Sequence, residues 1–189
     1  MAQSGGLFEA TRFARPCEVS RTTISNYLAV LEATFLVHVV RPFNTRRQHE
    51  IIAAPKVFGF DTGFVCFQRG WHRLRAEDRG VLWEHLVLNE MHAHLQTRDV
   101  RYWRDKRGHE IDFVVARRGR PPVAIECKWS TTDFEARNAR AFLARYPRAT
   151  VVVVAHDVTR RFTRRDQDMP VTYLNVPELL AMLSSIHSS

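Results

Sequence analysis

Two neighbouring strand-like runs constrain this chain more than any other feature: HEIDFVVA at residues 109–116 and VAIECKWS at residues 123–130, joined by the turn RRGRPP. Residues two apart on a strand share a face, so Glu126 and Lys128 point the same way and their immediate neighbours point the other way. Pairing the two runs as a hairpin brings Asp112 beside them. Two carboxylates and an ammonium group on one sheet face can hold a hard divalent cation next to a phosphodiester and a water.

Length and composition predict an ordinary globular protein. The chain has 189 residues, 45% of them hydrophobic and 25% charged, which suits one larger or two small domains. No run approaches the roughly 20 apolar residues of a membrane helix, and the N-terminus lacks the basic-then-apolar order of a secretion signal. We therefore expect no membrane partner and a cytoplasmic location.

Cysteine and histidine spacing predicts no zinc site. The three cysteines are far apart and form no C-x-x-C pair. His85, His92 and His94 cluster in one segment but do not match H-E-x-x-H. We interpret them as ordinary helix-surface histidines.

The formal charge of +8 favours a polyanionic partner such as nucleic acid. Clusters of arginine are better evidence than the total. They are Arg46-Arg47, Arg117-Arg118 with Arg120, Arg160-Arg161 and Arg164-Arg165. For any one cluster, solvated loop charge and phosphate contact are both open.

The first third of the chain predicts a winged helix-turn-helix. A short helix over residues 7–14 is followed by a second helix that begins after Ser20, which is well placed as an N-cap. Two apolar runs at 35–43 and 51–64 flank the basic segment 44–50 and suit the strands and loop of a wing. The apolar residues of the second helix recur at helical spacing: Ile24, Tyr27, Leu28 and Leu31.

In such a unit the second helix offers its N-terminal polar residues to the major groove. The candidate nucleic-acid contacts are Arg21, Thr22 and Asn26 on this helix and Arg46 and Arg47 on the wing loop. Winged-helix domains also serve as protein-docking units, so both uses remain open.

The pattern changes near Gly70 and Trp71, where a polar, basic connector begins. We place a domain boundary here, with a winged-helix-like domain at 1–70 and a second domain at 71–189. The second domain is expected to contain helices at 81–95, 134–146 and 176–185, and strands at 100–103, 109–116, 123–130, 149–155 and 171–174. The uniformly apolar run at 149–155 predicts a strand covered on both faces.

Glu84 is a further candidate because of its place on the helix at 81–95. It shares one stripe with Leu88, Met91 and Leu95, which directs its carboxylate towards the sheet. Glu90 lies about 120° away around the helix at roughly 100° per residue, and we expect it to be solvated.

The order helix, three strands, helix, strand, with Asp112 in the second strand and Glu126-Cys127-Lys128 in the third, resembles the core of the PD-(D/E)XK nuclease superfamily. That is the restriction-endonuclease fold. The resemblance implies an α/β fold in which Asp112, Glu126 and the backbone carbonyl of Cys127 coordinate Mg²⁺ or Mn²⁺. It also implies that Lys128 orients or deprotonates the attacking water and offsets charge on the phosphate, and that Glu84 holds a second ion or a metal-bound water.

A closer resemblance covers nearly the whole chain. The series SRTTISNYLAVLEATFLVHVVRPF, APKVFGFDTGF, LWEHLVLNEM, YWRDKRGHEIDFVV and VAIECKWS is similar to the C-terminal region of a large prokaryotic family of AAA-type ATPases. That region combines a winged helix with a nuclease-like domain of unknown function. The chain has no G-x-x-x-x-G-K-[ST], so we expect no ATP site in it and consider a separate P-loop ATPase chain as a partner.

Two functions follow as expectations. The first is a DNA-binding protein with a PD-(D/E)XK site that hydrolyses phosphodiesters as a Mg²⁺-dependent endonuclease, with a homodimer conceivable. The second is a non-catalytic module of an AAA-type ATPase that binds DNA or a partner, in which Glu126 and Lys128 form a salt bridge and Asp112 is only a polar strand position.

Overall fold

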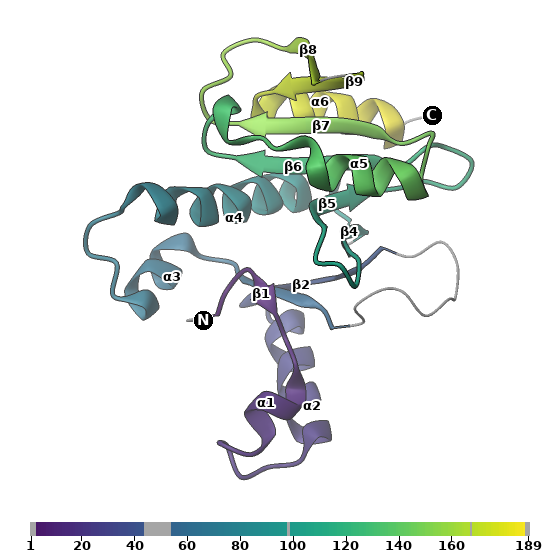
Figure 1. Cartoon of the computed structure of the whole chain (residues 1–189). Helices are drawn as coiled ribbons and strands as arrows, with labels where there is room; N and C mark the ends of the chain where they lie inside the picture. Colours follow the sequence, from purple (N-terminus) through teal and green to yellow (C-terminus); the bar gives the residue numbers. More distant parts are fainter. Residues whose placement is uncertain (1–2, 44–53, 98, 167, 188–189) are drawn as a thin grey trace.

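The protein has a mixed α/β fold built on one sheet. The structure is a computed structural model and describes residues 3–43, 54–97, 99–166 and 168–187. Within these ranges nine strands form a single sheet in the order β1-β3-β2-β4-β5-β6-β7-β9-β8. Figure 1 shows this sheet with its helices.

The elements follow one another along the chain as predicted in most places. The strands are β1 Gly6–Leu7, β2 Val37–Pro42, β3 Lys56–Gly59, β4 Val100–Arg104, β5 Glu110–Val115, β6 Val123–Lys128, β7 Thr150–Ala155, β8 Phe162–Asp166 and β9 Met169–Leu174. The helices are α1 Ala10–Ala14, α2 Arg21–Ala33, α3 Thr62–Arg69, α4 Ala76–Leu95, α5 Ala136–Arg145 and α6 Val176–His187, with a 3₁₀ turn at Thr131–Asp133.

The predicted hairpin is confirmed. β5 and β6 pair antiparallel, with Phe113 opposite Ile125 and Val115 opposite Val123. β6 then pairs parallel with β7, and β7 pairs parallel with β9. The hairpin strands therefore lie inside the sheet, where their side chains are covered from both faces.

Helices cover both faces of this central part. One apolar core joins α4 and α6 to Ile125 of β6 and to Val152 and Val154 of β7. The other apolar core joins α5 to side chains on the opposite face of the sheet, among them Val151 and Val153 of β7. The prediction that 149–155 forms a strand covered on both faces is confirmed, and burying each valine contributes about 1.5–3 kcal/mol.

The N-terminal helices are less buried than their apolar stripe predicts. Ser20 caps α2 by accepting the N–H of Thr23 at 3.0 Å, as expected. On α2, however, only Ile24 is buried, while the side chain of Tyr27 is 58% exposed. Figure 1 shows α1 and α2 projecting away from the rest of the molecule, and Val30 and Leu31 of α2 are exposed as well.

Three local predictions were wrong. The run at 51–64 is not one strand: β3 ends at Gly59, and Asp61 caps the unpredicted helix α3 by accepting the N–H of Phe64 at 2.5 Å. The short first helix begins at Ala10 rather than at residue 7, because Gly6–Leu7 pairs with β3. The strands expected at 149–155 and 171–174 left none between them, yet β8 forms there and pairs with β9, a ladder that its polar sequence does not indicate.

The sheet continues across the predicted domain boundary. Arg41 and Pro42 of β2 pair in parallel with Arg101 and Tyr102 of β4. The boundary at residue 70 stays a prediction, but backbone pairing joins the two sides. In the part of the chain described, none of the helices combines the length and hydropathy of a membrane-spanning segment.

Candidate functional site

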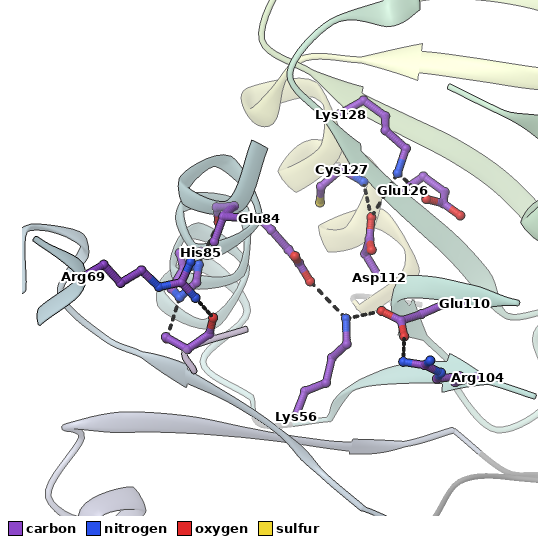
Figure 2. Close-up of polar contacts among 12 residues, drawn as sticks. Lys56, Arg69, Glu84, His85, Arg104, Glu110, Asp112, Glu126, Cys127 and Lys128 are labelled. Atoms are coloured by element: carbon purple, nitrogen blue, oxygen red, sulfur yellow. Dashed lines mark hydrogen bonds and ion pairs between the residues drawn. The ribbon is translucent and has the colours of Figure 1, made fainter. Parts of the chain in front are cut away.

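Asp112, Glu126 and Lys128 meet at the end of the β5–β6 hairpin (Figure 2). The Lys128 ammonium lies 2.7 Å from Glu126 Oε2 and 3.6 Å from Asp112 Oδ2. Asp112 Oδ2 also accepts the backbone N–H of Cys127 at 2.8 Å. The strand alternation predicted this convergence. Cys127, one residue on, joins the opposite core with α4 and α6.

Glu126 is the most deeply placed of these groups. Its side chain is only 2% exposed, and its Oε1 is buried without a hydrogen-bond partner among the described residues. Burial and the neighbouring Asp112 charge raise the pKa of Glu126 to about 8, although Lys128 opposes this. A proton shared with Asp112, or a cation, would satisfy the unpartnered oxygen.

Asp112 and Lys128 carry opposite charges at neutral pH. Burial opposes ionisation of Asp112, yet Lys128, Lys56 and the Cys127 N–H hold its pKa below its ordinary value. Burial likewise opposes the charge on Lys128, but Asp112 and Glu126 raise the pKa of Lys128. The ammonium therefore keeps its proton and can stabilise negative charge nearby.

A second cluster surrounds Lys56 of β3 (Figure 2). Its ammonium pairs with Glu84 Oε1 at 3.3 Å and with Glu110 Oε1, and Arg104 Nη1 binds the other oxygen of Glu110 at 3.1 Å. The Lys56 side chain is only 5% exposed. Attraction to Glu84, Asp112 and Glu110 outweighs burial and raises the pKa of Lys56.

Glu84 points inward from α4, as its stripe predicts: Leu88 and Met91 are fully buried and Glu90 is exposed. Burial raises the pKa of Glu84 to about 7, against the pull of Lys56. Glu84 forms an ion pair with Lys56, and it interacts with Asp112 through longer-range charge repulsion. The structure thus gives two neighbouring clusters, with Asp112 between them.

Sequence reasoning missed Lys56, Glu110 and Arg104. A signal for Glu110 was available, because it lies two residues before Asp112 on the same strand. Lys56 lies in the run APKVFGFDTGF, which carries part of the family resemblance but gives no local sign of a place in the site. Its burial depends on contact with a helix 28 residues further along the chain.

The carboxylates of Asp112 and Glu126 suit a divalent cation that takes few protein ligands. No group of three His, Cys, Asp or Glu side chains with metal-binding geometry occurs in the described ranges. Mg²⁺, however, keeps several waters and is commonly held by one or two carboxylates. Asp112 and Glu126, with the unpartnered Oε1, fit that smaller ligand set.

The predicted nucleic-acid contacts lie elsewhere. Arg21, Thr22 and Asn26 are exposed on the first two turns of α2. Arg46 and Arg47 fall outside the described residues. Contact of any of these with nucleic acid stays a prediction.

The histidine interpretation was wrong at His85. This side chain is fully buried, with Nε2 2.6 Å from Ser4 Oγ and Nδ1 2.7 Å from the carbonyl of Val81. Burial lowers the pKa of His85 to about 4. It faces the N-terminal segment rather than solvent, which helical spacing within α4 could not indicate.

A family model described as a domain of unknown function, DUF4143, matches residues 79–174, just over half of the chain. The chain belongs to this family. A second model, described as a domain of unknown function, DUF8612, matches residues 1–75 of the DUF4143 chain. Lys56 therefore lies in the DUF8612 match at residues 1–75, and the other groups of the site lie in the DUF4143 match at residues 79–174.

Two mycobacterial proteins are relatives of this DUF4143 protein. Uncharacterised proteins of Mycobacterium bovis and Mycobacterium tuberculosis are each 30% identical to it over 95% of this chain. The chain spans 42% of the length of these relatives.

A solved assembly of Thermococcus gammatolerans McrB AAA+ hexamers with bound McrC is similar at 14% identity and a TM-score of 0.38. That match covers 94% of this chain and 50% of the other. A TM-score this low does not establish a shared fold.

Proposed function

We propose that this protein is a nucleic-acid-binding protein whose Asp112, Glu126 and Lys128 form a PD-(D/E)XK-type site for Mg²⁺-dependent phosphodiester hydrolysis. The observation that carries the proposal is the unpartnered, buried Oε1 of Glu126 beside the ionised Asp112. The order α4, β4, β5, β6, α5, β7 supports it, with Asp112 in the second of the three strands and Glu126 and Lys128 in the third.

In this proposal Asp112 and Glu126 hold the ion, which supplies a bound water of lowered pKa. The backbone carbonyl of Cys127 remains a proposed third ligand, and Glu84 a proposed partner of a metal-bound water. Lys128, whose ammonium keeps its proton, offsets charge on the phosphate rather than abstracting a proton. Of the roles expected for Lys128, deprotonation of the attacking water is therefore not part of the proposal.

DNA is the proposed substrate because of the net charge and the exposed polar turns of α2. The winged-helix architecture of the N-terminal part belongs to the same proposal, supported by α1, α2 and the antiparallel pair β2–β3. A cytoplasmic location and a homodimer remain predictions.

The test is nicking of supercoiled, branched and single-stranded DNA with Mg²⁺ or Mn²⁺. Wild type should cut, while Asp112→Ala, Glu126→Gln and Lys128→Ala should lose activity by about 100-fold or more. Lys106→Ala, in an exposed turn, is the matched control and should cut like wild type. Equal rates for all five proteins would indicate a contaminant and defeat the proposal.

A second candidate is a non-catalytic DNA- or partner-binding module of an AAA-type ATPase. The ion pairs favour it, since Lys128 already faces Asp112 and Glu126, and Lys56 already faces Glu84 and Glu110. A P-loop ATPase, on a further domain or on a separate chain, is the partner it proposes. It predicts no heat of Mg²⁺ or Mn²⁺ binding in calorimetry and unchanged partner binding by Asp112→Asn.

A further inference from the structure

The surroundings of Lys56 are those of a bound cation. Oxygens of Glu84 and Glu110 contact its ammonium, and the charge of Asp112 acts on it from the neighbouring cluster. The rings of Phe58 and Tyr102 approach the ammonium at 5.9 and 5.7 Å from their centroids. Carboxylate oxygens around a small positive charge are also the ligands that a hard divalent ion takes.

The location of this cluster matters because Asp112 interacts with both lysines. Lys128 lies 3.6 Å from Asp112 Oδ2 on one side, and Lys56 attracts the same carboxylate from the other. Two-metal hydrolytic sites hold two ions roughly 3.5–4 Å apart, which clamp the attacking and leaving oxygens between them. Here one of the two sides is occupied by a side chain of the protein.

We infer that Lys56 is a tethered cation of the site: between Glu84 and Glu110 its ammonium takes the place that a second divalent ion would fill, so the site binds one divalent ion. Lys56 is thus a positioning residue and does not touch the reacting atoms. The one-ion count rests on the proposed function, whereas the occupancy of the Glu84–Glu110 cluster by Lys56 does not.

The inference also links the two parts of the chain. Lys56 comes from residues 1–75, matched by the DUF8612 model, and Glu84 and Glu110 come from residues 79–174, matched by the DUF4143 model. A charge supplied by one part therefore completes a carboxylate cluster of the other. Displacing β3 would remove Lys56 and leave the Arg104–Glu110 ion pair in that cluster.

The experiment titrates Mn²⁺ into the full chain by calorimetry and follows thermal unfolding with and without Mn²⁺. Wild type should bind about one ion. Lys56→Met should bind about one more ion than wild type. Its Tm should be lower than that of wild type in the presence of chelator and should rise again when Mn²⁺ is added. Lys106→Met, the exposed-lysine control, should match wild type in both measurements.

A double variant separates charge from packing. Glu84→Gln with Lys56→Met removes one negative and one positive charge together, so it should recover Tm in chelator and bind no additional ion. If the double variant is as unstable as Lys56→Met, or if Lys56→Met gains neither Mn²⁺ binding nor Mn²⁺-dependent Tm, the inference is overturned.

The outcomes for the two proposals differ. Wild type without Mn²⁺ binding, together with a Lys56→Met variant that binds an ion, would sink the proposed metal site while supporting the role of Lys56. If wild type and Lys56→Met each bind one ion, the proposed metal site is supported and the role of Lys56 is overturned.

Discussion

The carboxylate of Asp112 accepts a hydrogen bond from the backbone N–H of Cys127 at 2.8 Å. This contact lies just beyond the Phe113–Ile125 pair, where the β5–β6 pairing ends. This hydrogen bond ties Asp112 to the residue that lies between Glu126 and Lys128. Together with the ion pairs of Lys128 to Glu126 and Asp112, it holds the three charged groups in their relative positions.

Replacing Asp112 by Ala should lower the free energy of unfolding by about 2–4 kcal/mol. The substitution leaves the Cys127 N–H without its acceptor and removes one of the two carboxylates that offset the charge of Lys128. Asp112→Asn keeps an acceptor and should cost less. Urea unfolding measures both. Asp99→Ala, whose side chain is 77% exposed, should change stability by no more than about 0.5 kcal/mol. Equal losses for Asp112→Ala and Asp99→Ala would contradict the expectation.

Glu126 should make wild-type stability fall as pH rises. Its folded pKa is raised from 4.5 to about 8, so the folded state binds more protons than the unfolded state between these values. Stability is therefore lost progressively from about pH 4.5 to about pH 8. Glu126→Gln should remove this loss, and its stability relative to wild type should improve between about pH 5.5 and 8.5 in urea titrations. Glu90→Gln, exposed on α4, should leave the wild-type slope unchanged.

His85 should act in the opposite direction. Its folded pKa is lowered from 6.5 to about 4, so the unfolded state binds more protons in that window. His85 therefore contributes about 3 kcal/mol to the free energy of unfolding above about pH 6.5, and this contribution is lost as the pH falls towards 4. His85→Gln should flatten the stability slope over this range, even though lost packing lowers the absolute value. The exposed His72→Gln is the control, and a slope unchanged by His85→Gln would refute the assignment.

If α2 contacts DNA, Arg21→Ala with Asn26→Ala should weaken duplex binding and reduce the salt slope by about 1. Fluorescence anisotropy over a range of salt concentrations measures both. Arg137→Ala, exposed on α5, removes the same charge elsewhere. An affinity and slope identical to wild type would exclude this face of α2 from the interface.

The hairpin shows how far local pattern reaches. Period-two alternation placed Glu126 and Lys128 on one face and Cys127 on the other, and the structure agrees. Helical spacing likewise directed Glu84 inward. Such patterns work because side-chain direction depends on the residue's own backbone and its nearest neighbours in sequence.

Helix α3 shows where local pattern fails. Phe60 and Phe64 extend the apolar run after β3, and that run suggested a longer strand. The capping side chain of Asp61 and the left-handed Gly70, at φ 66°, define the helix instead. Both signals are present in the sequence and were outweighed by hydrophobicity.

The sequence by itself determined the faces: which side chains of β5, β6, β7 and α4 point to the core and which gather as charges. Only the tertiary structure decided the partners. The parallel pairing of β2 with β4, the burial of His85 against Ser4 and the insertion of Lys56 between Glu84 and Glu110 join segments far apart in the chain. Periodicity records the direction of a side chain, whereas the group it meets depends on how distant segments pack, and a single sequence does not encode that locally.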